Sequence, residues 1–143
     1  MGPIVCATRG GEASYRTQAR AIELAKERNL ELVFLCVVDA GFAGPLSKRL
    51  AAALDDELKR LGRSLLNVAE TRAQDQGVPA KTVCMSGPVR ESIEAYLRQV
   101  SASTLVIGCS RSSERHQAFD SEDVTDFAER LRQTTSAEVI LVA

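Results

Sequence analysis

The alternation of short apolar runs with longer stretches of helical periodicity constrains the fold of this chain most. The apolar runs lie at residues 3–8, 32–38, 80–85, 104–108 and 139–142. A continuous apolar run of this length is typical of a strand that is covered on both faces, as in a parallel sheet. Apolar residues at helical spacing fill the intervals, at 13–28, 46–76, 89–100 and 123–133. This order predicts a doubly wound α/β fold, with five parallel strands, helices on both faces and right-handed crossovers.

Composition excludes several classes of protein. The 143 residues suffice for one domain, residues 1–143, and with only 4% aromatic residues its core must be aliphatic. A net charge of −1 and the absence of Trp argue against nucleic-acid binding. The four cysteines are widely spaced and there is one histidine, so no metal site is predicted and the thiols are expected in the core. No apolar stretch reaches the length of a membrane span and no signal peptide is evident, so we expect a cytoplasmic protein without membrane insertion.

Residues 46–76 carry a continuous apolar stripe. Its members recur every three or four residues, which places them on one face of a helix; they are Leu46, Leu50, Leu54, Leu58, Leu61, Leu65, Val68 and Ala69. Gly77 and Pro79 follow and predict the end of the helix. We expect the stripe to pack against the sheet; docking of a partner is the alternative.

The loop that follows the fourth apolar run has an unusual composition. The run ends at Gly108, and residues 109–123 contain no glycine. A loop that holds phosphate brings backbone N–H groups close to the ligand, and glycine permits that approach. Glu122, Asp123 and Asp126 also place carboxylates at the start of the next helix, where they would repel a triphosphate.

After the first apolar run, residues 9–14 read Arg-Gly-Gly-Glu-Ala-Ser. This opening resembles that of the universal stress protein family, which usually has a strand followed by Asp-Gly-Ser-Glu-x-Ser. Gly10, Glu12 and Ser14 match, whereas Arg9 replaces the aspartate and Gly11 replaces a serine. Further similar segments follow in the family's order, so the resemblance spans the chain; they lie at 21–25, 87–93, 105–108, 127–131 and 139–142.

The resemblance implies the strand order 3-2-1-4-5 and a ligand crevice between the first and fourth strands. In members that bind nucleotides, the fourth strand is followed by Gly, two residues, Gly, nine residues and Gly-Ser or Gly-Thr. Gly108 matches the first glycine, Arg111 replaces the second, and the final pair is missing. The family's aspartate after the first strand contacts the nucleoside, and Arg9 cannot replace it as an acceptor. The nucleotide motif is therefore degenerate, no cofactor is predicted, and ATP and AMP are disfavoured.

Another small anion could occupy the same crevice. Three arginines end or follow its strands, and guanidinium groups bind anions by bidentate contacts. The alternative is that these arginines are solvated and paired with nearby carboxylates. His116 lies in the loop without an expected partner, and no catalytic residue is predicted. The candidate ligand-binding residues are Thr8, Arg9, Gly10, Val38, Gly108, Ser110, Arg111 and Arg115.

The last strand is expected at an edge of the sheet. Its apolar residues Val139, Ile140, Leu141 and Val142 are consecutive and include no proline or lysine, so the edge is open to pairing with a second chain. The resemblance adds that many family members dimerise through this strand. Two functions are predicted: a non-enzymatic, homodimeric regulatory or interaction module of the stress response, or a sensor that binds a nucleotide or another small anion. Either function is compatible with a free protein and with a domain of a longer protein.

Overall fold

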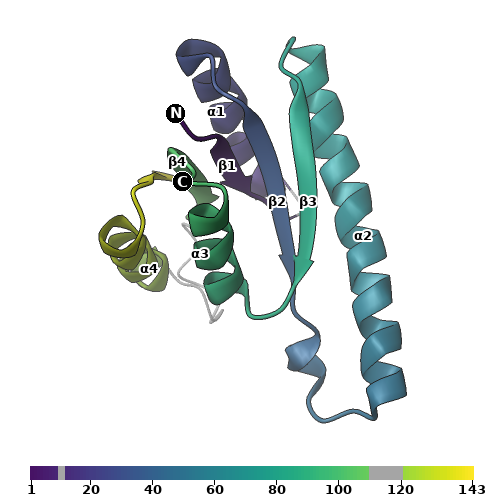
Figure 1. The fold of residues 1–143 in the computed structure, drawn as a ribbon. Helices are drawn as coiled ribbons and strands as arrows, with labels where there is room; N and C mark the ends of the chain where they lie inside the picture. The colour runs from purple at the N-terminus through teal and green to yellow at the C-terminus, as the bar shows by residue number, and fades with distance from the viewer. Residues whose placement is uncertain (10–11, 110–120) are drawn as a thin grey trace.

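The computed structural model describes residues 1–9, 12–109 and 121–143, and its strands form the parallel sheet that the sequence predicts (Figure 1). The five strands lie in the order β3-β2-β1-β4-β5, and every pairing is parallel. The doubly wound fold and its strand order are therefore confirmed. The strands are β1 (Ile4–Ala7), β2 (Leu32–Val38), β3 (Ala80–Ser86), β4 (Thr104–Gly108) and β5 (Glu138–Val142).

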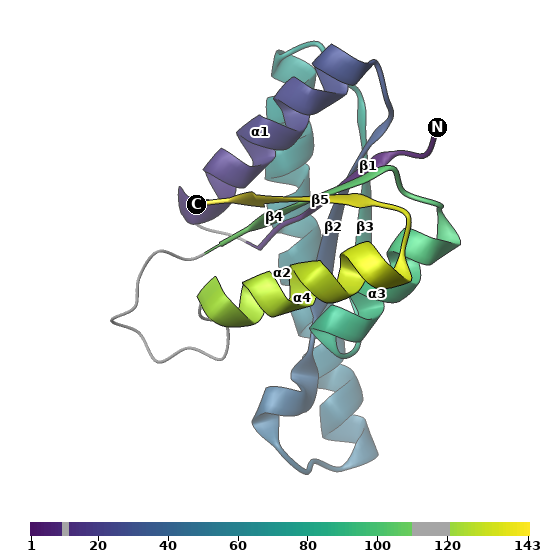
Figure 2. The same ribbon diagram turned by 90° about the vertical axis from the view of Figure 1, so that its left-hand side faces the viewer.

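Helices cover both faces of the sheet (Figure 2). Side chains alternate along each strand, so that Ile4 and Phe34 face one layer while Val5 and Leu35 face the other. The first layer holds α1 (Glu12–Arg28) and α2 (Lys48–Asp75), and the second holds α3 (Val89–Gln99) and α4 (Ser121–Thr134). Both cores are mainly aliphatic, as the composition requires.

Helix α2 extends past the carboxyl ends of the strands (Figures 1 and 2). Its 28 residues span about 42 Å at 1.5 Å per residue. A short 3₁₀ helix, η1 (Ala40–Ala43), precedes it in what the sequence predicted as a loop. Ser47 caps α2 by accepting a hydrogen bond from the N–H of Leu50 at 3.2 Å, which sets its start two residues after the expected Leu46. None of the described helices is both long and apolar enough to cross a membrane.

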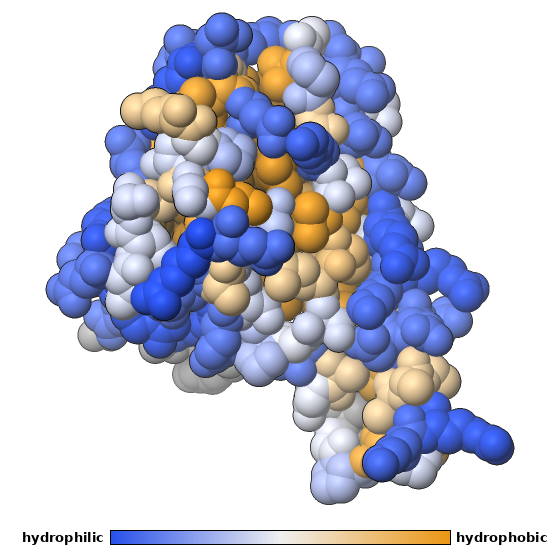
Figure 3. Space-filling view, viewed as in Figure 1, coloured by the Kyte–Doolittle hydropathy of each residue, from blue (hydrophilic) through white to orange (hydrophobic). Residues whose placement is uncertain are grey.

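The predicted packing of the leucine stripe is wrong for most of its members. The residues of α2 that are buried are Gly62, Leu66, Ala69 and Ala73, of which only Ala69 belongs to the stripe. Leu46, Leu50, Leu61 and Val68 are exposed, and the three remaining leucines are half-buried. Apolar residues accordingly reach the surface of the lobe formed by η1 and the start of α2, at the lower right of Figure 3.

The close approach of α2 to the sheet explains this difference. A Cβ atom at Gly62 would lie 3.1 Å from the Sγ of Cys84 and 3.3 Å from the Sγ of Cys36, which face each other on β3 and β2. Small residues therefore make the contact with the sheet, and the larger leucines are turned toward one side of the helix. Periodicity identified the helix correctly but selected the wrong face as its core.

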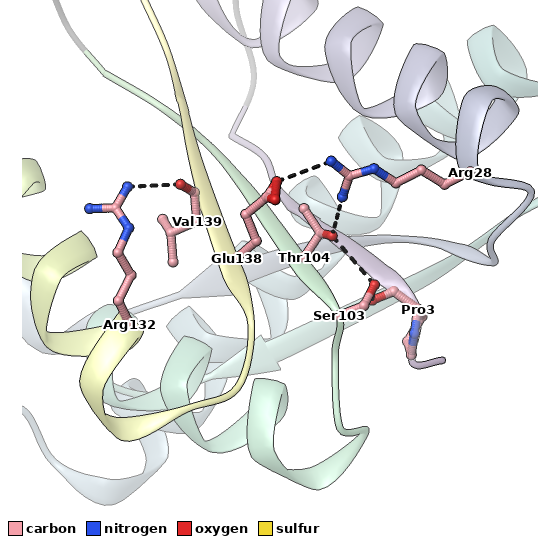
Figure 4. A network of polar contacts seen from close by, with 7 residues as sticks. All are labelled: Pro3, Arg28, Ser103, Thr104, Arg132, Glu138 and Val139. Carbon is pink, nitrogen blue, oxygen red and sulfur yellow. Dashed lines mark hydrogen bonds and ion pairs between the residues drawn. The ribbon is translucent and has the colours of Figure 1, made fainter.

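A polar clamp holds the amino end of β5 (Figure 4). The guanidinium of Arg28, at the end of α1, donates to the hydroxyl of Thr104 at 2.9 Å and to the carboxylate of Glu138 at 3.1 Å. Arg132 of α4 donates to the carbonyl of Val139 at 2.9 Å. Two helices from opposite layers thus fix the last strand of the sheet.

We predict that Gly62→Leu lowers the free energy of unfolding by about 1–3 kcal/mol, because the added side chain must displace the two thiols below it. Urea unfolding followed by circular dichroism measures the change. Ala53→Leu, at an exposed position of the same helix, is the matched control and should change stability by less than about 0.5 kcal/mol. Full stability of Gly62→Leu would show that the contact is not tight.

Candidate functional site

The carboxyl ends of β1 and β4 form the switch point of the sheet. The chain leaves β1 for α1 on one face and leaves β4 for α4 on the other. Ala7 pairs with Ile107, so Thr8 and Gly108 lie side by side where the two strands end. Ligands of open α/β sheets bind in the crevice that such diverging connections create. Two of the predicted site residues are therefore brought together.

A buried polar pair lies beside the carboxyl end of β1. Thr8 is held by its N–H, which donates to the carbonyl of Leu35 at 2.9 Å. Its hydroxyl accepts a hydrogen bond from Nε2 of Gln18 at 2.9 Å. Gln18 is only 4% exposed, although it belongs to α1 and carries a polar amide. The sequence analysis missed Gln18; the available signal was an amide four residues before the buried Ile22, on the apolar face of the helix.

The Gln18 amide has one polar atom without a partner. Its Oε1 is buried and accepts no hydrogen bond from any described residue. Exchanging the two amide atoms would let the Thr8 hydroxyl donate to Oε1 and would leave the nitrogen unpaired instead. A buried polar group without a partner costs about 1–3 kcal/mol. The amide therefore has one hydrogen-bonding position left for a further polar group, and Gln18 also lines the groove between α1 and α2.

Packing favours a glycine at position 108, in addition to its match with the loop motif. A Cβ atom at this position would lie 3.0 Å from the hydroxyl oxygen of Thr17 on α1. The next residue, Cys109, is half-buried and donates its N–H to the carbonyl of Val142 at 2.7 Å. The absence of a side chain at Gly108 therefore has a structural explanation that does not depend on phosphate binding.

Arg9 and Val38 border the crevice from its β1 and β2 sides. Arg9 is exposed directly after Thr8, and its carbonyl accepts a hydrogen bond from the hydroxyl of Ser14 at 3.1 Å. Val38 ends β2, which pairs with β1, and its carbonyl accepts from the N–H of Gly87 at 2.9 Å. The remaining candidates fall outside the described residues, so the arginine cluster stays a prediction; they are Gly10, Ser110, Arg111 and Arg115.

The described cysteines do not form a metal site. No group of three or more His, Cys, Asp or Glu side chains in residues 1–9, 12–109 and 121–143 is arranged to hold a metal ion. Cys6 and Cys36 are buried, as expected, whereas Cys84 and Cys109 are half-buried. Burial and the neighbouring Cys84 raise the pKa of the Cys36 thiol to about 11, so this thiol is protonated at neutral pH.

The strand order and the helices on both faces define a doubly wound α/β protein whose switch point lies between β1 and β4. Residues 1–143, the whole chain, match the model of the universal stress protein family. The chain therefore belongs to the universal stress protein family, as its sequence suggested. A search of curated proteins found none that matches it.

Solved structures agree with this assignment. A protein of the family from Burkholderia pseudomallei is 24% identical, with a TM-score of 0.72 over 97% of this chain and 94% of that chain. The universal stress protein UspA from Lactobacillus plantarum is 18% identical, with a TM-score of 0.78 over 99% of this chain and 97% of that chain. A universal stress protein in complex with cAMP is 19% identical, with a TM-score of 0.72 over 99% and 97% of the two chains. At these identities the similarity establishes the fold.

Thr8→Val should lower the free energy of unfolding by about 1–3 kcal/mol, because it removes the described partner of the buried Gln18 amide. Combining it with Gln18→Met removes both polar groups, so the double variant should be more stable than Thr8→Val alone. Urea unfolding of the three variants and the unmodified protein tests this coupling. Strict additivity of the two substitutions would contradict it.

Proposed function

We propose that this protein is a non-enzymatic regulatory module that acts as a homodimer and binds ATP weakly or not at all. The observation that carries the proposal is Arg9, which stands at the end of β1 beside Thr8, where nucleotide-binding members of the family have an aspartate. A guanidinium has only donors, so it cannot accept the hydrogen bonds of a nucleoside. The glycine-free sequence after Gly108 supports the same conclusion, since it removes the close backbone approach that a triphosphate needs.

A second candidate function is a sensor for a smaller ligand at the same crevice. The unpartnered Gln18 amide favours it, because a bound molecule would supply the missing hydrogen bond. One structural relative was solved in complex with cAMP, which carries a single phosphate. Such a ligand brings less negative charge to the acidic start of α4, where the helix bounds place Glu122 and Asp123 in the first turn.

The backbone of β5 supports the proposed dimer. The N–H of Glu138 and the carbonyl of Val142 bond to the β4 side, at 2.9 Å and 2.7 Å. Backbone groups alternate along a strand, so those of Val139 and Leu141 point away from β4 and are available for pairing with a second chain. The edge is less open than the sequence suggested, however, because Arg132 already donates a hydrogen bond to the carbonyl of Val139. An antiparallel pair of β5 strands about a two-fold axis would have to displace this contact.

Titration calorimetry should detect no ATP binding tighter than about 1 mM. In the same assay cAMP tests the sensor alternative. If cAMP binds at the crevice, Gln18→Met should weaken its binding because the ligand loses its partner there, while Gln99→Met, at an exposed position of α3 in the other layer, should leave it unchanged. Micromolar ATP affinity of the unmodified protein would contradict the main proposal. Absence of cAMP binding would contradict the sensor alternative for this ligand.

Leu141→Pro should shift the protein toward monomer, because it removes an outward-facing N–H while the bonds to β4 remain. Arg132→Ala should act in the opposite direction, since it frees the Val139 carbonyl for pairing. Light scattering across a dilution series measures both equilibria, and circular dichroism checks that each variant is folded. Equal masses for Leu141→Pro, Arg132→Ala and the unmodified protein would refute pairing through β5.

A further inference from the structure

The exposed large apolar side chains gather on one side of the molecule. Among the described residues they are Met1, Tyr15, Leu46, Leu50, Leu61 and Val68. Apart from Met1 at the chain terminus, all of them belong to α1, to α2 or to the turn just before α2. Leu50 is 57% exposed, Leu61 58% and Val68 47%, which is unusual for three apolar residues on one helix. Apolar residues that cluster in this way mark an interaction surface.

The stripe faces the side of α2 on which α1 lies. Arg72 continues the three- and four-residue steps of the stripe, and its guanidinium stacks on the Tyr15 ring of α1, 3.2 Å from the ring centroid. On the sheet-facing side of α2, the thiol of Cys84 on β3 donates to the carbonyl of Lys59 at 3.9 Å. The leucines that precede Arg72 therefore border the space beside α1, not the free edge of the sheet.

A groove runs between α1 and α2 at the end of this stripe. Its volume is about 560 Å³, and its walls combine the apolar Tyr15, Ala19 and Ile22 with polar and charged residues, among them Gln18, Lys26 and Arg72. An amphipathic helix binds by placing an apolar face into a groove of this kind, with contacts every three or four residues. The stripe continues the groove along α2 toward the projecting lobe.

The spacing of the stripe selects a helix as its occupant. Leu54, Leu58, Leu61, Leu65 and Val68 follow one another at intervals of four, three, four and three residues. This 3.5-residue repeat is the seam of a two-stranded coiled coil, in which each apolar side chain fits between side chains of the facing helix. A strand has a two-residue repeat and cannot match it.

We propose that α2 pairs with α2 of a second copy of this chain, antiparallel across a two-fold axis. In that arrangement Leu61 lies against Leu65 of the partner subunit, and the same contact recurs on the other side of the axis. The two-fold axis then passes midway between Leu61 and Leu65.

Charge complementarity supports this occupant and this direction. Antiparallel pairing places Arg72 opposite Leu54 of the partner subunit and within one helical turn of Glu57 of the partner subunit. Among the described residues Arg72 forms no ion pair, and the one ion pair of Glu57 is with the exposed Arg60 of its own helix, at 3.7 Å. Parallel pairing would instead place Arg72 against Arg72 of the partner subunit, where like charges repel.

This interface is separate from the β5 edge and does not depend on the proposed function. Helix α2 covers β2 and β3, whereas β5 lies at the opposite edge of the sheet. A chain that uses both surfaces forms tetramers or larger assemblies, and a chain that uses α2 alone forms dimers.

The test compares masses by light scattering for the unmodified protein, Leu61→Glu and Asn67→Glu. Leu61→Glu places a charge in the seam and should halve the assembly, whereas Asn67→Glu adds the same charge on the exposed face of the same helix and should leave the mass unchanged. Because Leu61 is exposed in the monomer, circular dichroism and melting temperature should show that the variant is folded. An unchanged mass for Leu61→Glu, or a monomeric unmodified protein, overturns the proposal.

A charge exchange tests the antiparallel direction. Glu57→Lys and Arg72→Glu should each weaken the assembly, and the double variant should restore it because the pair is re-formed with its charges reversed. If Arg72 acted only by stacking on Tyr15 of its own chain, the double variant would be as weak as Arg72→Glu. That result would exclude the antiparallel pairing.

Discussion

The close contact of α2 with the sheet at Gly62 governs much of this structure. Because no side chain separates the helix from the thiols of Cys36 and Cys84, the helix axis lies near the sheet and small residues carry the contact. The leucines that would otherwise fill this layer are turned to the side of the helix. The same contact therefore both completes the core over β2 and β3 and leaves an apolar seam outside it. A single missing side chain thus links the packing of one layer to the apolar surface of the helix that covers it.

The sequence predicted the fold well because its signals are local. The run of residues 32–38 is apolar throughout and forms β2 with the expected bounds, and Gly77 follows the capping residue Gln76 at the end of α2. Strand order came from the resemblance to a family, since periodicity does not specify which strands are neighbours. The start of α2 was misplaced because the cap of Ser47 was overlooked, and its core face was misjudged because the approach of Gly62 to the sheet is a tertiary contact.

The candidate site was predicted only in outline. Thr8 and Gly108 could be placed at the crevice because both follow buried strands, whose ends meet in the sheet. Gln18 was missed because its position on an apolar helix face shows burial, and only the structure shows that its amide reaches Thr8. Gly108 was interpreted as part of a phosphate loop, yet the hydroxyl of Thr17 gives it a packing role as well. A residue can therefore match a motif for a reason other than the chemistry of that motif.

The clamp at Arg28 has a consequence for the last strand. Arg28 joins Thr104 at the start of β4 to Glu138 at the start of β5 (Figure 4), so it fixes the register of the two strands. A slip of one residue would separate Glu138 from Arg28 and would exchange the faces of Val139 and Ile140, which pack in different layers. The register of β5 relative to the rest of the sheet is therefore fixed at its amino end. A second chain that pairs with the outer edge of β5 would therefore find the outward-facing N–H and C=O groups of this strand in fixed positions.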